Sequence, residues 1–214
     1  MAGIGCVMNA RDGVVVATDT FLETPGAANG NIRQLDSHTV CYVATTGAIA
    51  MLDAYLAATL PLPDGAQAIV ASLFQYATTH LPVTGALPFE ITIVGLSTAG
   101  PAVRTIESVV WGGQAVRRIP YPGNLFMGHH SIPRYLADRI CRFAVSLRVV
   151  VGQAVFCAAE SRRTLPNFIR PHVAVVTISR DVGVQWVDEP TIQTLLDQAV
   201  TWARRLSVEL IGLF

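Results

Sequence analysis

Short runs of β-branched and apolar residues begin the chain and predict a first group of strands. The first two runs are separated by a link that ends in Asp12-Gly13, a dipeptide that favours a tight turn between antiparallel strands. Two further runs lie on either side of the polar turn Asp36-Ser37-His38. Between the two pairs the chain is rich in Gly, Ala, Pro and Asn, which predicts a loop. We expect strands over residues 4–8, 14–18, 31–35 and 39–45, with the loop over residues 21–31.

The spacing of apolar residues then changes to that of a helix. Residues 48–60 carry one apolar stripe and end before Pro61, so we expect a helix there. Asp64 is the expected N-cap of a second helix that ends near residue 80. The same patterns predict strands over 89–96, 102–110, 115–119 and 125–128, helices over 131–143 and 147–161, a hairpin of 173–179 with 184–187, and a last helix over 191–210.

The order of these elements predicts the fold class. Strands are followed by two helices, then by strands, two more helices, strands and a last helix. Antiparallel hairpins and paired helices do not form a parallel βαβ fold. We therefore expect an α+β protein in which two antiparallel sheets stack face to face with a helix pair on each outer side, a four-layer αββα sandwich. No internal repeat or linker divides the sequence, so residues 1–214 are expected to form a single domain.

Composition narrows the class of protein. The chain is 51% hydrophobic and 14% charged, and its 15 positive residues balance 15 negative ones. That balance argues against a nucleic-acid partner. No apolar run reaches the roughly 18–20 residues that a transmembrane helix needs, and no signal peptide is recognisable, so we expect a cytoplasmic protein without a membrane partner. The apolar excess predicts self-association into a homo-oligomer.

Lysine is missing from the chain, since all 15 positive residues are arginine. A guanidinium essentially keeps its proton, so a mechanism that needs a lysine amine is excluded. The four cysteines form no CxxC pair and have no metal-type spacing with histidine, so we expect buried thiols and neither a metal nor a cofactor. These cysteines are Cys6, Cys41, Cys141 and Cys157.

Several local sequences occur in an order that points to one family. Residues 12–20 read DGVVVATDT, residues 30–35 read GNIRQL, residues 44–47 read ATTG before a helix, and the last hairpin ends in Trp186-Val187-Asp188. Together they resemble the proteasome β-subunit family of the N-terminal nucleophile hydrolases, along essentially the whole chain. The resemblance implies the four-layer fold and descent from threonine peptidases.

In that family the first residue of the mature chain supplies the nucleophile and its α-amine acts as the base. A lysine lowers the pKa of the nucleophile, an aspartate holds the lysine, and N–H groups at a glycine turn bind the oxyanion. The resemblance places Ala2 at the nucleophile, Asp19 at the aspartate and Gly47 at the oxyanion glycine. Gln34, or Arg33 after a one-residue shift, stands at the lysine.

The last third of the chain also departs from the family pattern. Gly128-His129-His130-Ser131 stands where the family has a supporting Ser-Gly-Ser stretch, which makes His129 and Ser131 site-equivalent positions. Adjacent histidines on a helix point in different directions, so they are not expected to share a metal. The carboxylate expected after the fourth helix is missing, because residues 160–164 read ESRRT.

The missing nucleophile, lysine and carboxylate predict a catalytically silent homologue that acts as a self-assembling ring or stacked rings, or as a scaffold for related subunits. An active peptidase or amidohydrolase is the alternative, in two forms. Ala2 then replaces a natural threonine, or processing after Gly5 exposes Cys6 as a thiol nucleophile. Cys6 lies about three residues too close to Asp19 for that second form. A non-enzymatic module that holds a small ligand near Gly47 is the third reading.

Overall fold

The computed structural model describes residues 4–19, 31–43, 45–81, 87–97, 103–128, 145–164 and 173–211. In this part of the chain, ten strands form two five-stranded antiparallel sheets. The first sheet has the order β10-β9-β2-β1-β8 and the second the order β3-β4-β5-β6-β7. The strands of the first sheet are β1 (Ile4–Ala10), β2 (Gly13–Asp19), β8 (Leu125–Gly128), β9 (Val173–Ser179) and β10 (Gly183–Trp186). Those of the second are β3 (Ile32–Gln34), β4 (Thr39–Val43), β5 (Phe89–Leu96), β6 (Arg104–Trp111) and β7 (Val116–Pro120).

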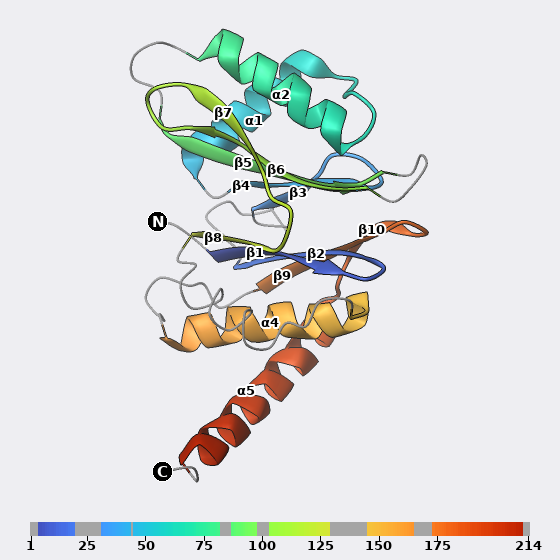
Figure 1. The fold of residues 1–214 in the computed structure, drawn as a ribbon, viewed down its shortest axis with the longest axis vertical. Coiled ribbons are helices and arrows are strands. Elements are labelled where there is room, and N and C mark those ends of the chain that lie inside the picture. Colours follow the sequence, from blue (N-terminus) through green and yellow to red (C-terminus); the bar gives the residue numbers. More distant parts are fainter. Residues whose placement is uncertain are drawn as a thin grey trace.

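Helices cover the outer face of each sheet (Figure 1). The described helices are α1 (Thr46–Thr59), α2 (Ala66–His80), α4 (Leu147–Thr164) and α5 (Glu189–Ile211). Helices α1 and α2 pack on the second sheet, and α4 packs on the first. Helix α5 contacts α4, and its C-terminal end extends away from the body (Figure 1). The expected α+β class with two antiparallel sheets is confirmed, while the helix expected over 131–143 lies outside the described residues.

Alternation along β2 explains why the sheets are buried on both faces. Val14 and Val16 point toward the second sheet, whereas Val15 and Ala17 point toward α4. All seven residues of β2 are buried, because the strand lies at the centre of its sheet with a layer on each side. The sheets therefore enclose an inner core, and each sheet forms an outer core with its helices.

Backbone contacts join the two sheets at one end of the sandwich. The turn between β3 and β4 lies against the turn between β9 and β10, where Val184 N donates to Ser37 O at 2.7 Å. The His38 Nε2 atom lies 3.1 Å from Arg180 O. Gly183 has a φ of 78°, and a Cβ added there would lie 2.2 Å from Ser37 O. Only glycine fits this approach, so this end of the space between the sheets is closed.

The start of α2 differs from the sequence expectation. Asp64 does not cap the helix; Gly65 is the N-cap, with a φ of 81° and no side-chain hydrogen bond to the first turn. Asp64 stands one residue too early, and its side chain is exposed. By contrast, Thr45 caps α1, since its Oγ1 accepts from Ala48 N at 3.2 Å.

Candidate functional site

The positions that the resemblance singled out divide into two groups. Cys6, Asp19, Arg33, Gln34 and Gly47 lie in the described part of the chain. Ala2, His129 and Ser131 lie outside the described residues.

Asp19 is the last residue of β2 and is only 2% exposed. It pairs in register with Val173 of β9, while Gly13 at the other end of β2 pairs with Ser179 beside the closed end of the sandwich. Asp19 therefore lies at the opposite end, where β1 begins. A carboxylate buried at a strand end is costly unless polar groups surround it, which makes this end of the sandwich the candidate site.

Tyr42 of β4 bridges the two sheets at this end. Its ring lies against Gly5 of β1, where an added Cβ would be 2.6 Å from Tyr42 Cζ. Burial raises the pKa of Tyr42, the nearby polar side chain of Thr18 lowers it, and the carboxylates of Asp19 and Glu90 raise it further. The phenol thus keeps its proton near neutral pH and can donate or accept a hydrogen bond.

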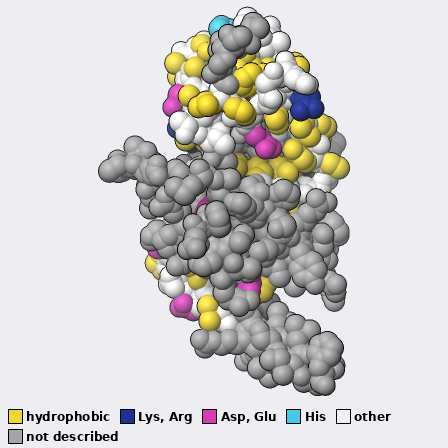
Figure 2. All heavy atoms as spheres, turned by 90° about the vertical axis from the view of Figure 1, so that its left-hand side faces the viewer, with side chains coloured by type: hydrophobic (Ala, Val, Ile, Leu, Met, Phe, Trp, Pro, Cys, Tyr) yellow, Lys and Arg dark blue, Asp and Glu magenta, His cyan; other side chains and the backbone are white. Residues whose placement is uncertain are grey.

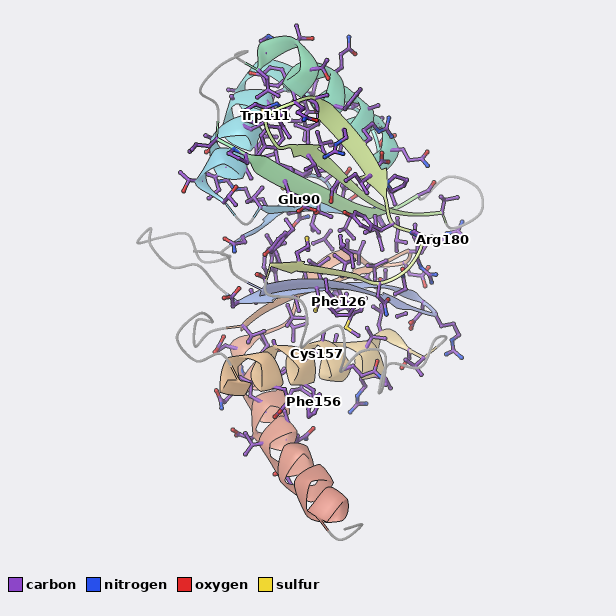
Figure 3. The ribbon with its side chains drawn as sticks, turned by 60° about the vertical axis from the view of Figure 1, so that its left-hand side comes forward. Glu90, Trp111, Phe126, Phe156, Cys157 and Arg180 are labelled. Atoms are coloured by element: carbon purple, nitrogen blue, oxygen red, sulfur yellow. The ribbon has the colours of Figure 1, made fainter. Side chains whose placement is uncertain are left out.

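A chain of hydroxyl groups crosses the same inner face of the second sheet. The Ser108 hydroxyl donates to Glu90 Oε1 at 3.0 Å, and Thr92 Oγ1 lies 2.8 Å from Ser108 Oγ. The Thr92 hydroxyl has one proton, which it donates to Ser108 Oγ or to Met127 Sδ at 3.2 Å. Figure 3 shows Glu90 on β5, on the side that looks toward the first sheet. Sequence reasoning missed this cluster, because only the strand register brings Tyr42 of β4 and Ser108 of β6 beside Thr92 of β5.

Arg33 and Gln34 are both engaged elsewhere. The Arg33 guanidinium forms an ion pair with Asp53 of α1, on the helix side of the second sheet. Arg33 also pairs in register with Cys41, which belongs to the outer core under α1 and α2. The Gln34 side chain is exposed, and its Nε2 donates to Asp36 O at 3.0 Å. Of the two candidates for the lysine position, Arg33 therefore binds a helix of the outer layer and Gln34 binds the backbone of a turn.

Gly47 lies in the first turn of α1. A Cβ added there would be 3.0 Å from Pro88 O and 3.1 Å from Leu87 Cβ. Close packing against the start of β5 thus explains the glycine without any bound ligand.

The described cysteines behave as structural residues. Cys6, Cys41 and Cys157 are buried as expected, while Cys141 lies outside the described residues. Cys6 is 3% exposed and packs in the outer core with α4, on the face of β1 that looks away from the second sheet. Figure 3 shows Cys157 on α4. Burial raises the pKa of the Cys41 thiol to about 12, with the Arg33 charge opposing it.

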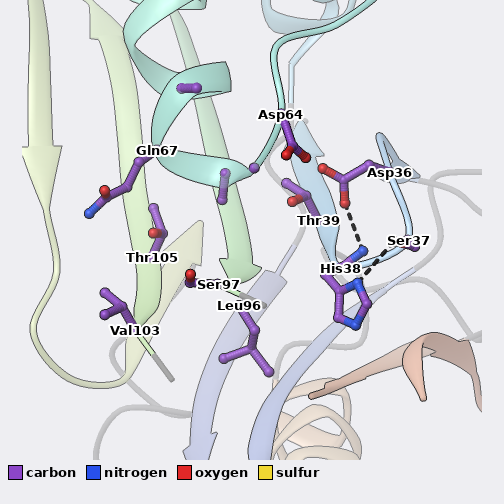
Figure 4. A pocket seen from close by; sticks show the side chains of 13 residues that line it. Asp36, Ser37, His38, Thr39, Asp64, Gln67, Leu96, Ser97, Val103 and Thr105 are labelled. Atoms are coloured by element: carbon purple, nitrogen blue, oxygen red, sulfur yellow. Dashed lines mark hydrogen bonds between the residues drawn. The ribbon is translucent and has the colours of Figure 1, made fainter. Parts of the chain in front are cut away.

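A separate pocket of about 490 Å³ lies at the closed end of the sandwich (Figure 4). Its walls come from the turn between β3 and β4, the start of α2 and the adjoining ends of β5 and β6. Asp36, Asp64 and His38 are its titratable lining residues. Within the described ranges, no group of three or more His, Cys, Asp or Glu side chains could hold a metal ion.

Two further findings bear on the class of protein. In the part of the chain that the structure describes, no helix combines the length and the apolar character needed to cross a membrane. The sequence matches no protein-family model and no curated protein.

Proposed function

We propose that this chain is a proteasome β-type subunit homologue that does not hydrolyse peptide bonds and acts as a self-assembling ring or scaffold subunit. The antiparallel sheets with helices on their outer faces support the kinship, as does the order of the local sequences. The proposal covers the fold family, the silence of the site and the assembly, and each part has its own test.

The main observation in favour of a catalytically inactive site is that the Arg33 side chain points away from it. Its guanidinium is held by Asp53 on the helix side of the sheet. The neighbouring Gln34 amide hydrogen-bonds within its own turn. Because the chain has no lysine and Ala2 has no hydroxyl, the activating cation and the attacking group of the family are both missing.

Cys6 is a poor substitute nucleophile. Its side chain is buried against α4 and faces away from the Tyr42 and Glu90 cluster. A thiol buried in this way is closed to a substrate. The Cys6 form of the enzyme alternative would require removal of residues 1–5, so the intact mass of the purified chain tests it.

Surface composition supports the assembly. Among the described residues, Leu60 is 71% exposed and Leu87 is 63% exposed. Figure 2 shows hydrophobic side chains gathered on the half of the molecule that carries α1 and α2. Apolar surface of this kind is often covered in an oligomer.

Hydrolysis of fluorogenic peptide amides and esters tests the silence of the site. We expect no turnover from the unmodified chain, from Ala2→Thr or from Ala2→Thr combined with Arg33→Gln, which serves as the control without a cation. Turnover by Ala2→Thr would instead support an enzyme whose threonine is replaced in this sequence. Turnover by the unmodified chain, with a covalent adduct near its amino end, would overturn the proposal.

A further inference from the structure

The pocket at the closed end of the sandwich has the size of a small-molecule site. Its volume of about 490 Å³ falls in the range of roughly 300–1,000 Å³ that ligand pockets occupy. Figure 4 shows side chains from the β3–β4 turn, from the start of α2 and from β5 and β6 around one hollow. Gly65 opens this hollow further, because a Cβ added there would meet nothing within 4 Å.

Two carboxylates line the pocket. Asp36 Oδ1 accepts from His38 N at 2.7 Å, which leaves the second carboxylate oxygen of Asp36 for another donor. Asp64, just before α2, is exposed and makes no ion pair among the described residues. No arginine lines the pocket, so its field is negative and favours a cation.

A buried hydroxyl provides the second, independent sign of a ligand. Thr39 is 0% exposed, and its Oγ1 has no hydrogen-bond partner in the described structure although it lines the pocket. A buried hydroxyl without a partner is unfavourable, and most such groups are satisfied by protein, water or ligand. A donor placed between Thr39 and the carboxylates would satisfy it.

The other classes of small ligand fit less well. The uncapped N-terminus of α2 would attract an anion, but Asp36 and Asp64 oppose one. A bare metal ion is too small for the volume, and the described residues offer no set of three metal-binding side chains. Leu96 and Val103 add apolar surface to the lining, which suits the carbon stem of an organic ligand.

We propose that this pocket binds a small organic cation, a primary ammonium group on a short aliphatic stem. The ammonium donates its three N–H groups to the carboxylates of Asp36 and Asp64 and to Thr39 Oγ1. The stem lies against Leu96 and Val103. This site lies at the end of the sandwich opposite Asp19, so it does not depend on the proposed function.

Calorimetric titration with n-butylamine at neutral pH tests the proposal, with 1-butanol and butyrate as the neutral and anionic counterparts. We expect saturable binding of butylamine and none of the other two. Removing one charge-assisted hydrogen bond weakens binding by about tenfold, which is the loss expected for Asp64→Asn and for Thr39→Val. The control Asp197→Asn neutralises an exposed carboxylate on α5 and should leave the affinity unchanged.

Circular dichroism of each variant establishes that it is folded before it is titrated. The proposal is overturned if butylamine does not bind at millimolar concentration, or if butanol or butyrate binds as tightly. It is also overturned if Asp64→Asn or Thr39→Val binds butylamine like the unmodified chain, or if Asp197→Asn weakens binding as much as they do. None of these results affects the proposed assembly, whose test is the mass of the particle.

Discussion

Replacing Gly183 tests how the two sheets are held together at the closed end. The residue has a φ of 78°, and an added Cβ would lie 2.2 Å from the Ser37 carbonyl oxygen. That oxygen also accepts from Val184 N, so it cannot move away without breaking a hydrogen bond. The substitution Gly183→Ala therefore imposes backbone strain and also separates the two turns.

Gly65→Ala is the matched control, because Gly65 has nearly the same φ of 81° but open space around its Cβ. A non-glycine residue with a positive φ is strained by about 1–3 kcal/mol, and this strain acts on both variants. Gly183→Ala also loses the Val184–Ser37 and His38–Arg180 hydrogen bonds, each worth about 0.5–1.5 kcal/mol. The free energy of unfolding of Gly183→Ala should thus be lower than that of Gly65→Ala by about 1–3 kcal/mol.

Urea unfolding followed by tryptophan fluorescence and circular dichroism measures this difference. Both variants should be compared at one protein concentration, since self-association adds to apparent stability. Equal destabilisation of the two variants would refute the reasoning, because it would mean that the contact between the turns contributes nothing beyond the backbone strain.

Three further predictions concern titratable side chains. Cys41, whose pKa is raised to about 12 by burial, should resist iodoacetamide at pH 8 in the folded chain and react after unfolding in urea, as read by peptide mass spectrometry; labelling of the folded chain would contradict its burial. The Asp188 carboxylate accepts from Thr191 N at 2.7 Å, and this hydrogen bond lowers the pKa of Asp188. The ionised carboxylate therefore stabilises α5 at pH values above the ordinary pKa of aspartate. That stabilisation is lost as the pH falls through the lowered pKa of the folded chain. Asp188→Ala should therefore lower the melting temperature at pH 7 and have little effect at pH 2, and an equal effect at both would count against the cap. Arg118→Ala should lower the free energy of unfolding in urea by about 1 kcal/mol, because the partly buried Glu107 carboxylate loses the two hydrogen bonds that Arg118 donates to it. Adding Glu107→Gln to this variant should recover part of the loss.

The elements of the fold could be predicted because their signals are local. In β2, valines on alternate faces belong to different cores, and that alternation is visible in the residues DGVVVATD. Local signals also predicted two hairpins. The Asp-Gly turn before β2 indicated the pairing of β1 with β2, and the polar turn at Asp36 indicated the pairing of β3 with β4. The predicted N-cap of α2, Asp64, was wrong. A carboxylate near the start of a helix does not determine the N-cap when the next residue is a glycine that can adopt a positive φ.

The candidate site could be predicted only in part. The sequence pointed to Asp19 and Gly47, but it gave no sign that Arg33 is held by Asp53, 20 residues further along the chain on the neighbouring helix. The contact between Tyr42 and Gly5 could not be predicted either. It depends on how the two sheets stack and on the fact that glycine has no side chain to keep the Tyr42 ring away. Such contacts follow from register and packing, which no local pattern encodes.

The pocket beside α2 shows the same limit. Asp36 and Asp64 are 28 residues apart in the sequence and come together only because a turn of the second sheet lies beside the start of a helix. Thr39 reads as an ordinary strand residue, and its unpartnered hydroxyl becomes visible only once the neighbouring atoms are placed.

Native mass spectrometry of the unmodified chain at micromolar concentration tests the central claim most directly. A subunit that works by assembly should be found as a closed complex of many copies that retain residues 2–5, so that Cys6 is not at the amino end. A strictly monomeric chain under the same conditions would contradict the account.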